Sequence, residues 1–276
     1  WCEVDGSPEG PFGRWFAPGP DAGGTRQVAG WYSAGDRSGT WSTWYPGGEP
    51  ASQGPYHADA REGWWTFWRP DGSVEREGAF AGGLEAGPWV VRAPDRDAEE
   101  EGEYAAGARE GIWLLWGADG GLLASTTWAA GLRSGPHARY HAGTEQLAEA
   151  GSYADDRRVG TWQRWHPGGQ LAQEGAYVDG SRDGPWAQWT ASGQPDWEGA
   201  YAAGQPHGTW RIWDRLGPPP AIVREGQMVA GHEDGLWVGR FEGTEVTADE
   251  IRWVAGSREG ATAAWYASGA PLSVGQ

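Results

Sequence analysis

The chain has 276 residues, of which 48 are Gly and 22 are Trp, against 5 Phe and 1 Met. Its apolar material therefore consists mostly of large flat rings separated by residues without a side chain. The formal net charge of −17 argues against nucleic acid or an anionic membrane surface as partner, because neutralising phosphates needs clustered positive charge.

Several absences narrow the class further. Cys2 is the only cysteine, so an intramolecular disulfide is excluded. No apolar run reaches 18 residues, so we expect no membrane span. The start at Trp1 without Met indicates a processed chain. Localisation stays open between the cytoplasm and export as a lipoprotein, the latter requiring that Cys2 follow a removed signal peptide. All 21 positive residues are Arg, which is typical of a GC-rich genome.

A repeat of about 24 residues organises the chain. We number its positions from Gly30 as position 0. A single array over 1–276 is expected, with a partial first repeat 1–29 and then repeats 30–53, 54–77, 78–101, 102–125, 126–150, 151–174, 175–198, 199–225, 226–250 and 251–276.

Five positions of the repeat define its pattern. Position 0 is Gly except at Thr126 and Ile251, position 2 is aromatic except at Met228, and position 9 is always Gly. Trp recurs at position 11, as in Trp41 and Trp65. It recurs again at position 14, in the row Trp44, Trp68, Trp116, Trp165, Trp189, Trp213 and Trp265.

This pattern predicts two strands per repeat. The first runs from Gly-x-Tyr to a Gly-x-x-x-Gly segment, whose two glycines supply the positive φ of a tight reversal. The second carries Gly-x-Trp-x-x-Trp and ends in turn pairs such as Gly47-Gly48, Asp71-Gly72, Gly168-Gly169 and Ser192-Gly193. The expected fold is all-β: tandem β-hairpin repeats forming an elongated, twisted, single-layer antiparallel meander sheet. Glycine opposite a ring would let the ring lie on the backbone.

The spacing of the two Trp positions raises a question of parity. Residues three apart in a regular strand point to opposite faces, so Trp41 and Trp44 imply either aromatics on both faces or an intervening bulge. We favour aromatics on both faces, with the position-14 row as the more open one.

The run from Gly160 to Gly169, with Glu174 to Gly180 after it, resembles the variant MORN repeat of bacteria, known as the YwqK-type antitoxin family. The resemblance extends from about Gly6 to Gly269. It implies an extended β-hairpin array, a protein-binding role and, for some members, service as antitoxin or immunity partner of a toxin. The chain departs from the family in having Arg between the paired glycines and no Asn in the second turn.

Two groups of residues are candidate binding sites. The row Trp44, Trp68, Trp116, Trp165, Trp189 and Trp213 could bind sugars, proline-rich segments or cations, although the composition favours rings that only pack on each other. An irregular turn is rich in acids and predicts a solvated acidic loop that could contact a basic partner: Asp95, Asp97, Glu99, Glu100 and Glu101. A calcium-binding EF-hand fails there because Glu100 occupies the required glycine position.

Other irregular segments carry weaker signals. His137, Arg139 and His141 would alternate onto one strand face, but no third metal ligand accompanies the two histidines. Residues 217–220 predict a protruding polyproline segment. A ladder of turn arginines beside acids predicts a charged, soluble edge that opposes aggregation: Arg37, Arg61, Arg109, Arg133, Arg158, Arg182 and Arg258.

No nucleophile elbow, phosphate loop or metal motif is present in the sequence, so no catalytic residue, metal or cofactor is predicted. The leading hypothesis is a non-enzymatic protein-binding repeat scaffold, antitoxin-like, with a basic, toxin-like protein partner. The alternative is a carbohydrate or cell-envelope ligand binder that uses the Trp row. The oligomeric state is not indicated.

Overall fold

The structure, a computed structural model, describes residues 2–4, 7–17, 24–94, 98–214, 220–260 and 262–275. Residue contacts divide the chain into an N-terminal unit, Trp1–Arg133, and a C-terminal unit, Ser134–Gln276, and each is described by itself. Among the described residues no helix is long and apolar enough to cross a membrane.

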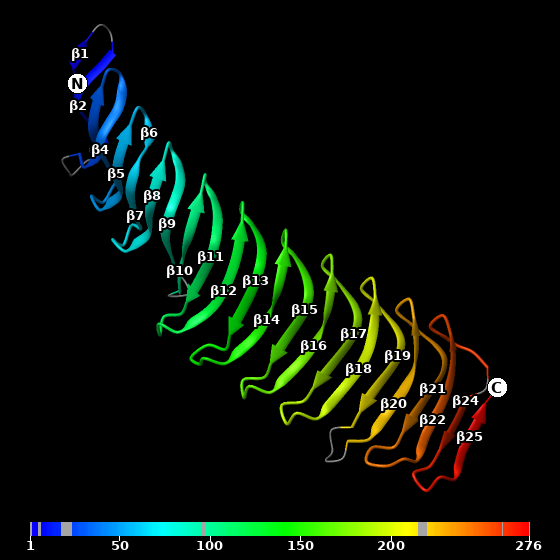
Figure 1. Cartoon of the computed structure of the whole chain (residues 1–276). Helices are drawn as coiled ribbons and strands as arrows, with labels where there is room; N and C mark the ends of the chain where they lie inside the picture. The colour runs from blue at the N-terminus through cyan, green and yellow to red at the C-terminus, as the bar shows by residue number, and fades with distance from the viewer. Residues whose placement is uncertain are drawn as a thin grey trace. The chain divides into compact units, whose positions relative to one another are not determined.

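The N-terminal unit consists of consecutive antiparallel strands, seen in Figure 1 as one hairpin after another. The strands are β1 (Cys2–Val4), β2 (Ser7–Trp15), β3 (Arg26–Ser33), β4 (Asp36–Trp44), β5 (Pro50–His57), β6 (Ala60–Arg61), β7 (Gly63–Trp68), β8 (Val74–Ala81), β9 (Leu84–Ala93), β10 (Ala98–Ala105), β11 (Ala108–Trp116) and β12 (Leu122–Ala129). A thirteenth strand, β13 (Leu132–Tyr140), begins at the end of this unit.

The C-terminal unit continues in the same manner. Its strands after β13 are β14 (Leu147–Ala154), β15 (Arg157–Trp165), β16 (Leu171–Val178), β17 (Ser181–Trp189), β18 (Pro195–Ala202), β19 (Gln205–Trp213), β20 (Ile222–Val229), β21 (His232–Arg240), β22 (Thr247–Val254), β23 (Ser257–Arg258), β24 (Thr262–Trp265) and β25 (Pro271–Gly275). Strands that follow one another in sequence pair antiparallel, as β16 pairs with β15 and β17. The predicted all-β fold of tandem hairpins is confirmed.

The first reversal of each repeat is a two-residue turn. In the hairpin of β3 and β4 it consists of Ala34 and Gly35, with φ of 50° and 93°, and positive φ at both positions is the signature of a type I′ turn. The prediction that both glycines of Gly-x-x-x-Gly lie in this reversal is wrong for the second one. Gly39 lies inside β4 with φ of 65°, at a bulge where the register with β3 shifts.

The second reversal is longer and matches the predicted turn pairs. Between β4 and β5 the backbone N–H of Gly48 donates to the Tyr45 carbonyl at 2.9 Å, and the N–H of Tyr45 donates to the Glu49 carbonyl at 2.8 Å. Gly48 has φ of 99°, which explains why glycine recurs at this place.

The core of each unit is a column of buried position-11 tryptophans. Trp65, Trp89 and Trp186 have relative exposures of 2%, 1% and 3%. Each ring lies flat on the position-0 glycine of its own repeat: a Cβ on Gly78 would lie 2.3 Å from Cδ2 of Trp89. The indole N–H completes the contact, since Trp89 Nε1 donates to the Ala79 carbonyl at 2.9 Å. A single sheet layer thus buries its largest side chains against its own backbone.

The position-2 aromatics fill the spaces between these tryptophans. Tyr177 meets Trp186 edge to face, with ring centroids 5.2 Å apart, and meets Trp162 of the preceding repeat edge to face at 6.1 Å. Such pairs contribute about 0.5–1.5 kcal/mol each beyond area burial. Each Tyr at position 2 contacts a ring on either side, which is a Trp except at Phe12 beside Tyr32 and His137 beside Tyr153. The aromatic column therefore links successive repeats.

Hydrogen bonds between the first turns of successive repeats also link the repeats. The N–H of Gly83 donates to the Arg61 carbonyl of the preceding repeat at 2.9 Å. The Glu62 carboxylate also accepts the turn N–H of Gly82 at 2.8 Å. Equivalent acids elsewhere do the same, as Asp183 accepts the N–H of Ala203. Acidic residues at position 8 therefore accept hydrogen bonds from the first turn of the next repeat.

Candidate binding surface

Each unit presents two faces, defined by strand alternation. The tryptophan face carries the buried position-11 Trp and position-2 aromatics. The opposite face, here called the open face, carries positions 1, 10, 12 and 14. Within β7, for example, Trp65 lies on the tryptophan face, whereas its neighbour Trp64 lies on the open face and is 50% exposed.

The predicted Trp row lies on the open face, opposite the position-11 column, so both faces carry aromatics. The six residues are only partly exposed: Trp44, Trp68, Trp116, Trp165, Trp189 and Trp213. Each pairs directly across the hairpin with a position held by an aliphatic residue or proline, as Trp68 pairs with Val74 and Trp165 with Leu171. These rings therefore have packing partners, and a binding role for them remains a prediction.

The predicted acidic loop is corrected by the structure. Asp95 and Asp97 lie outside the described residues. Glu99, Glu100 and Glu101 are not in a loop but in β10, because that strand begins at Ala98 and pairs with β9 and β11.

Each of the three glutamates has a partner within the sheet. Glu100 forms an ion pair with Arg109 at 2.5 Å. Glu101 accepts the indole N–H of Trp116 at 2.9 Å, and Glu99 contacts Arg92. These acids are structural partners of the strands and not a free acidic cluster.

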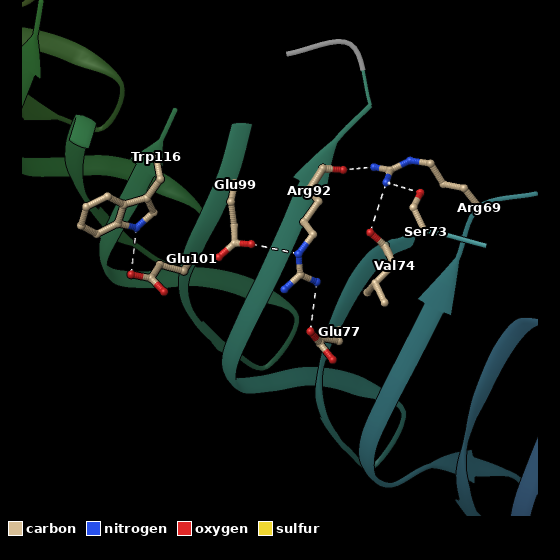
Figure 2. A network of polar contacts seen from close by, with 8 residues as sticks. All are labelled: Arg69, Ser73, Val74, Glu77, Arg92, Glu99, Glu101 and Trp116. Carbon is tan, nitrogen blue, oxygen red and sulfur yellow. Dashed lines mark hydrogen bonds and ion pairs between the residues drawn. The ribbon is translucent and has the colours of Figure 1, made fainter. Parts of the chain in front are cut away.

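Figure 2 shows the network that replaces one tryptophan of the position-14 row. Arg92 stands where most other repeats have Trp, and it forms ion pairs with Glu77 at 3.0 Å and Glu99 at 2.9 Å. Arg69 donates to the Arg92 carbonyl and, at 3.1 Å, to the Val74 carbonyl. Although these residues line a shallow hollow, their charged groups already pair with one another.

The irregular repeat 126–150 uses its histidines structurally. His137 takes the place of the buried Trp, stacking on Trp162 with centroids 5.8 Å apart and meeting Tyr153 edge to face. His141 lies one residue beyond the end of β13 at Tyr140, and it lines the same hollow as Arg139. Among the described residues, no group of three or more His, Cys, Asp or Glu could hold a metal ion. Of the predicted polyproline segment 217–220, only Pro220 is described.

The turn arginines do not form only a solvated edge. Their guanidinium groups lie over rings of the tryptophan face, as Arg109 lies 4.0 Å from the Trp113 centroid and Arg158 lies 4.0 Å from that of Trp162. Burial acts to lower the pKa of Arg182, but hydrogen bonds to the tyrosine hydroxyls on either side outweigh it and raise the pKa. These arginines cover the aromatic column through cation–π contacts.

A row of exposed apolar residues on the open face was not found by sequence reasoning. In the N-terminal unit it includes Trp31, Trp64 and Ile112, with relative exposures of 49%, 50% and 60%. These occupy positions 1 and 10, which pair across the strands, as Trp64 pairs with Ala79 and Ile112 with Thr127. The sequence did hold a signal for this row. Trp31 and Trp64 lie outside the regular Trp positions, and each directly follows a glycine at position 0 or 9.

Comparison with known proteins agrees with this architecture. The family described as MORN repeat variant matches residues 37–58 and 158–179, one stretch in each unit. Each match begins at the second residue of a repeat's second strand, Arg37 in β4 and Arg158 in β15, and ends in the first turn of the next repeat. A search of curated proteins found no match.

Proposed function

We propose that the chain is a non-enzymatic scaffold that binds a protein partner through its open face. The observation that carries the proposal is the row of Trp31, Trp64 and Ile112, each about half exposed or more on a face where the six rings of the Trp row are only partly exposed. MORN repeats are generally binding scaffolds and typically non-catalytic, which supports this class of function. Exposed large apolar groups in a common row are typical of a surface that a partner covers.

The charge of the same row favours a basic partner. Pro88 pairs with Glu103, which places an exposed carboxylate between Trp64 and Ile112 in the row. A partner with apolar side chains flanked by Arg or Lys would complement this surface. The resemblance to the bacterial YwqK-type family leads us to propose, as the finer assignment, an antitoxin or immunity role against a basic toxin.

The test begins with partner capture from the source cell and identification, followed by titration of the purified partner. Trp64→Ser and Ile112→Ser should each weaken binding at least about tenfold. Leu84→Ser is the matched control, because Leu84 is 51% exposed but lies next to the first turn, away from the row. Equal weakening by the control, or no effect of the row variants, would count against the open face. Rescue of growth on co-expression with a neighbouring toxin gene tests the antitoxin assignment.

The alternative, a glycan binder that uses the Trp row, has weaker support because those rings are packed across the hairpins. It predicts binding of neutral sugars that is lost in Trp165→Ala and Trp189→Ala. Unchanged tryptophan fluorescence across a broad sugar panel would count against it.

A further inference from the structure

A hollow in the C-terminal unit differs in charge from the rest of this acidic chain. It lies at the second-turn end of β13 to β17 and has a volume of about 280 Å³. Among the described residues, its lining contains no Asp or Glu, although acids outnumber arginines 38 to 21 in the chain. Its polar lining residues are Arg139, Arg164, His141, His166, Gln173 and Gln188.

Two guanidinium groups give the hollow its charge. Arg139 on β13 and Arg164 on β15 both pair with Glu149 on the strand between them, so all three lie in one row of the tryptophan face. Glu149 is 7% exposed, and its carboxylate accepts Arg158 at 2.9 Å but lies 3.7 Å from Arg164. The side chain of Arg139 has no hydrogen bond or ion pair with any described residue. Since Arg158 balances Glu149, the two lining arginines leave an excess of positive charge.

Neutral polar groups continue the row. Gln173 pairs with Arg164 on one side and with Gln188 on the other, and the two amides are linked at 3.4 Å. The Gln188 amide N–H donates to Asp196 at 2.7 Å and not back to Gln173. The side-chain carbonyl oxygen of Gln173 therefore remains available as an acceptor. Amides that both donate and accept suit the hydroxyl groups of a sugar.

The two histidines are oriented by the backbone. His141 Nε2 lies 3.0 Å from the Trp165 carbonyl and His166 Nε2 lies 2.9 Å from the Trp189 carbonyl. A carbonyl can only accept, so Nε2 carries the proton and Nδ1 of a neutral ring remains an acceptor.

The cationic pair is not a requirement of the repeat. Position 13, held by Arg139 and Arg164 in two successive repeats, is occupied elsewhere mostly by uncharged residues: Thr43, Phe67, Val91, Leu115, Gln188, Ile212 and Gly239. In the N-terminal unit, Phe67 at this position stacks on Trp65 and Trp89. Packing therefore favours an apolar group here, and the two arginines need a different explanation.

We propose that this hollow binds the carboxylate of an acidic sugar, a uronate. A planar guanidinium matches a carboxylate with two parallel hydrogen bonds, and the amides and imidazoles complement ring hydroxyls. The volume is below that of a drug-sized pocket and suits one small polar ring. The site lies on the tryptophan face, so it is separate from the proposed protein-binding row. The proposal narrows the glycan alternative to acidic sugars whose carboxylate is held by arginine. Trp165 and Trp189 of the Trp row also line the hollow.

The test titrates the full chain with an oligogalacturonate, with the neutral galactose oligomer of equal length and with a glutamate-rich peptide, at constant ionic strength. Calorimetry gives affinity, and proton NMR follows the imidazole signals, which are few because the chain has 6 His. We expect saturable binding of the uronate alone, with the signals of His141 and His166 shifting.

Arginine variants then localise the site. Arg139→Gln and Arg164→Gln should weaken uronate binding at least about tenfold. Arg157→Gln removes the same charge from β15 at the first-turn end, where that side chain is 62% exposed, and should leave binding unchanged. Arg139→Gln breaks no described contact, so its thermal unfolding should match that of the native chain. No saturable uronate binding, equal binding of the neutral oligomer, tighter binding of the peptide, or insensitivity to both arginine variants would each overturn the proposal.

Discussion

Replacing a position-0 glycine tests the principle by which this sheet buries its tryptophans. In Gly175→Ala the new Cβ would lie 2.0 Å from Cδ2 of Trp186, far inside contact distance. Gly175 does not have positive φ, so the cost arises from the ring and not from backbone strain. Trp186 is 3% exposed, and its Nε1 donates to the Ala176 carbonyl at 3.1 Å. The ring must leave its place on the backbone or push the strand aside.

The expected loss in unfolding free energy follows from what the displaced ring gives up. Overpacking alone costs about 1–3 kcal/mol. The indole hydrogen bond adds about 1 kcal/mol, and the edge-to-face contacts with Tyr177 and Tyr201 add about 0.5–1.5 kcal/mol each. Because the chain can relax in part, we expect a loss of about 3–5 kcal/mol. Urea unfolding of the full chain, followed by circular dichroism and by hydrogen exchange of the β16 and β17 amides, measures it.

Two comparisons make this prediction refutable. Gly184→Ala is the matched control, since Gly184 has φ of 73° with no atom within 4 Å of a new Cβ, and should cost only about 1 kcal/mol of backbone strain. Thr126 with His137, and Ile251 with Thr262, show that loss of glycine accompanies loss of Trp in this chain. Gly175→Thr with Trp186→His should therefore cost less than the sum of the single changes. A smaller loss for Gly175→Ala than for Gly184→Ala, or strict additivity of the pair, would refute the reasoning.

Three further variants test individual contacts. The backbone N–H and the guanidinium of Arg37 hold the pKa of Asp59 below its usual value. The ionised Asp59 therefore stabilises the fold fully above about pH 4, and this stabilisation is lost as the pH falls further. In acid titrations the difference in unfolding free energy between the native chain and Asp59→Asn should shrink. Tyr45→Phe removes a hydrogen bond of 2.7 Å to the Trp68 carbonyl and should cost about 1 kcal/mol in urea unfolding. Trp64→Ser, at a half-exposed ring, should change the unfolding free energy by about 0.5–1 kcal/mol at most.

The regular parts of the repeat could be predicted from sequence because each has one local cause. Glycine at position 0 leaves room for the Trp ring, and Gly48 in the second turn adopts positive φ. Both requirements recur with the period of the repeat and so can be recognised in the sequence. Gly39 was assigned to the wrong element because a glycine in a bulge and a glycine in a turn carry the same signal in a single sequence. The register between strands distinguishes a bulge glycine from a turn glycine, and this register cannot be derived from composition.

The candidate sites were harder to predict because partners lie in other strands. Glu101 is one of several consecutive acids in sequence, but in the sheet it accepts the indole N–H of Trp116 from the next strand. Exposure of Trp64 follows from alternation only once the bulge is known. Arg139 and Arg164, 25 residues apart, come together only through the strand that carries Glu149.

The acidic residues of the chain fall into a structural group and a surface group, and substitutions can distinguish the two. Glu110 accepts the turn N–H of Ala130 at 2.9 Å and so belongs to the hairpin stack, whereas Glu103 is exposed in the open-face row and its side chain has no partner among the described residues. Net charge alone cannot tell these carboxylates apart.

The two changes Glu110→Gln and Glu103→Gln alter charge equally. The first should lower stability by about 0.5–1.5 kcal/mol and leave partner affinity unchanged, because a neutral amide accepts the turn N–H less strongly. The second should leave stability unchanged and weaken a basic partner, with the difference fading at high salt. If both variants weakened the partner alike, long-range charge and not the open-face row would govern binding.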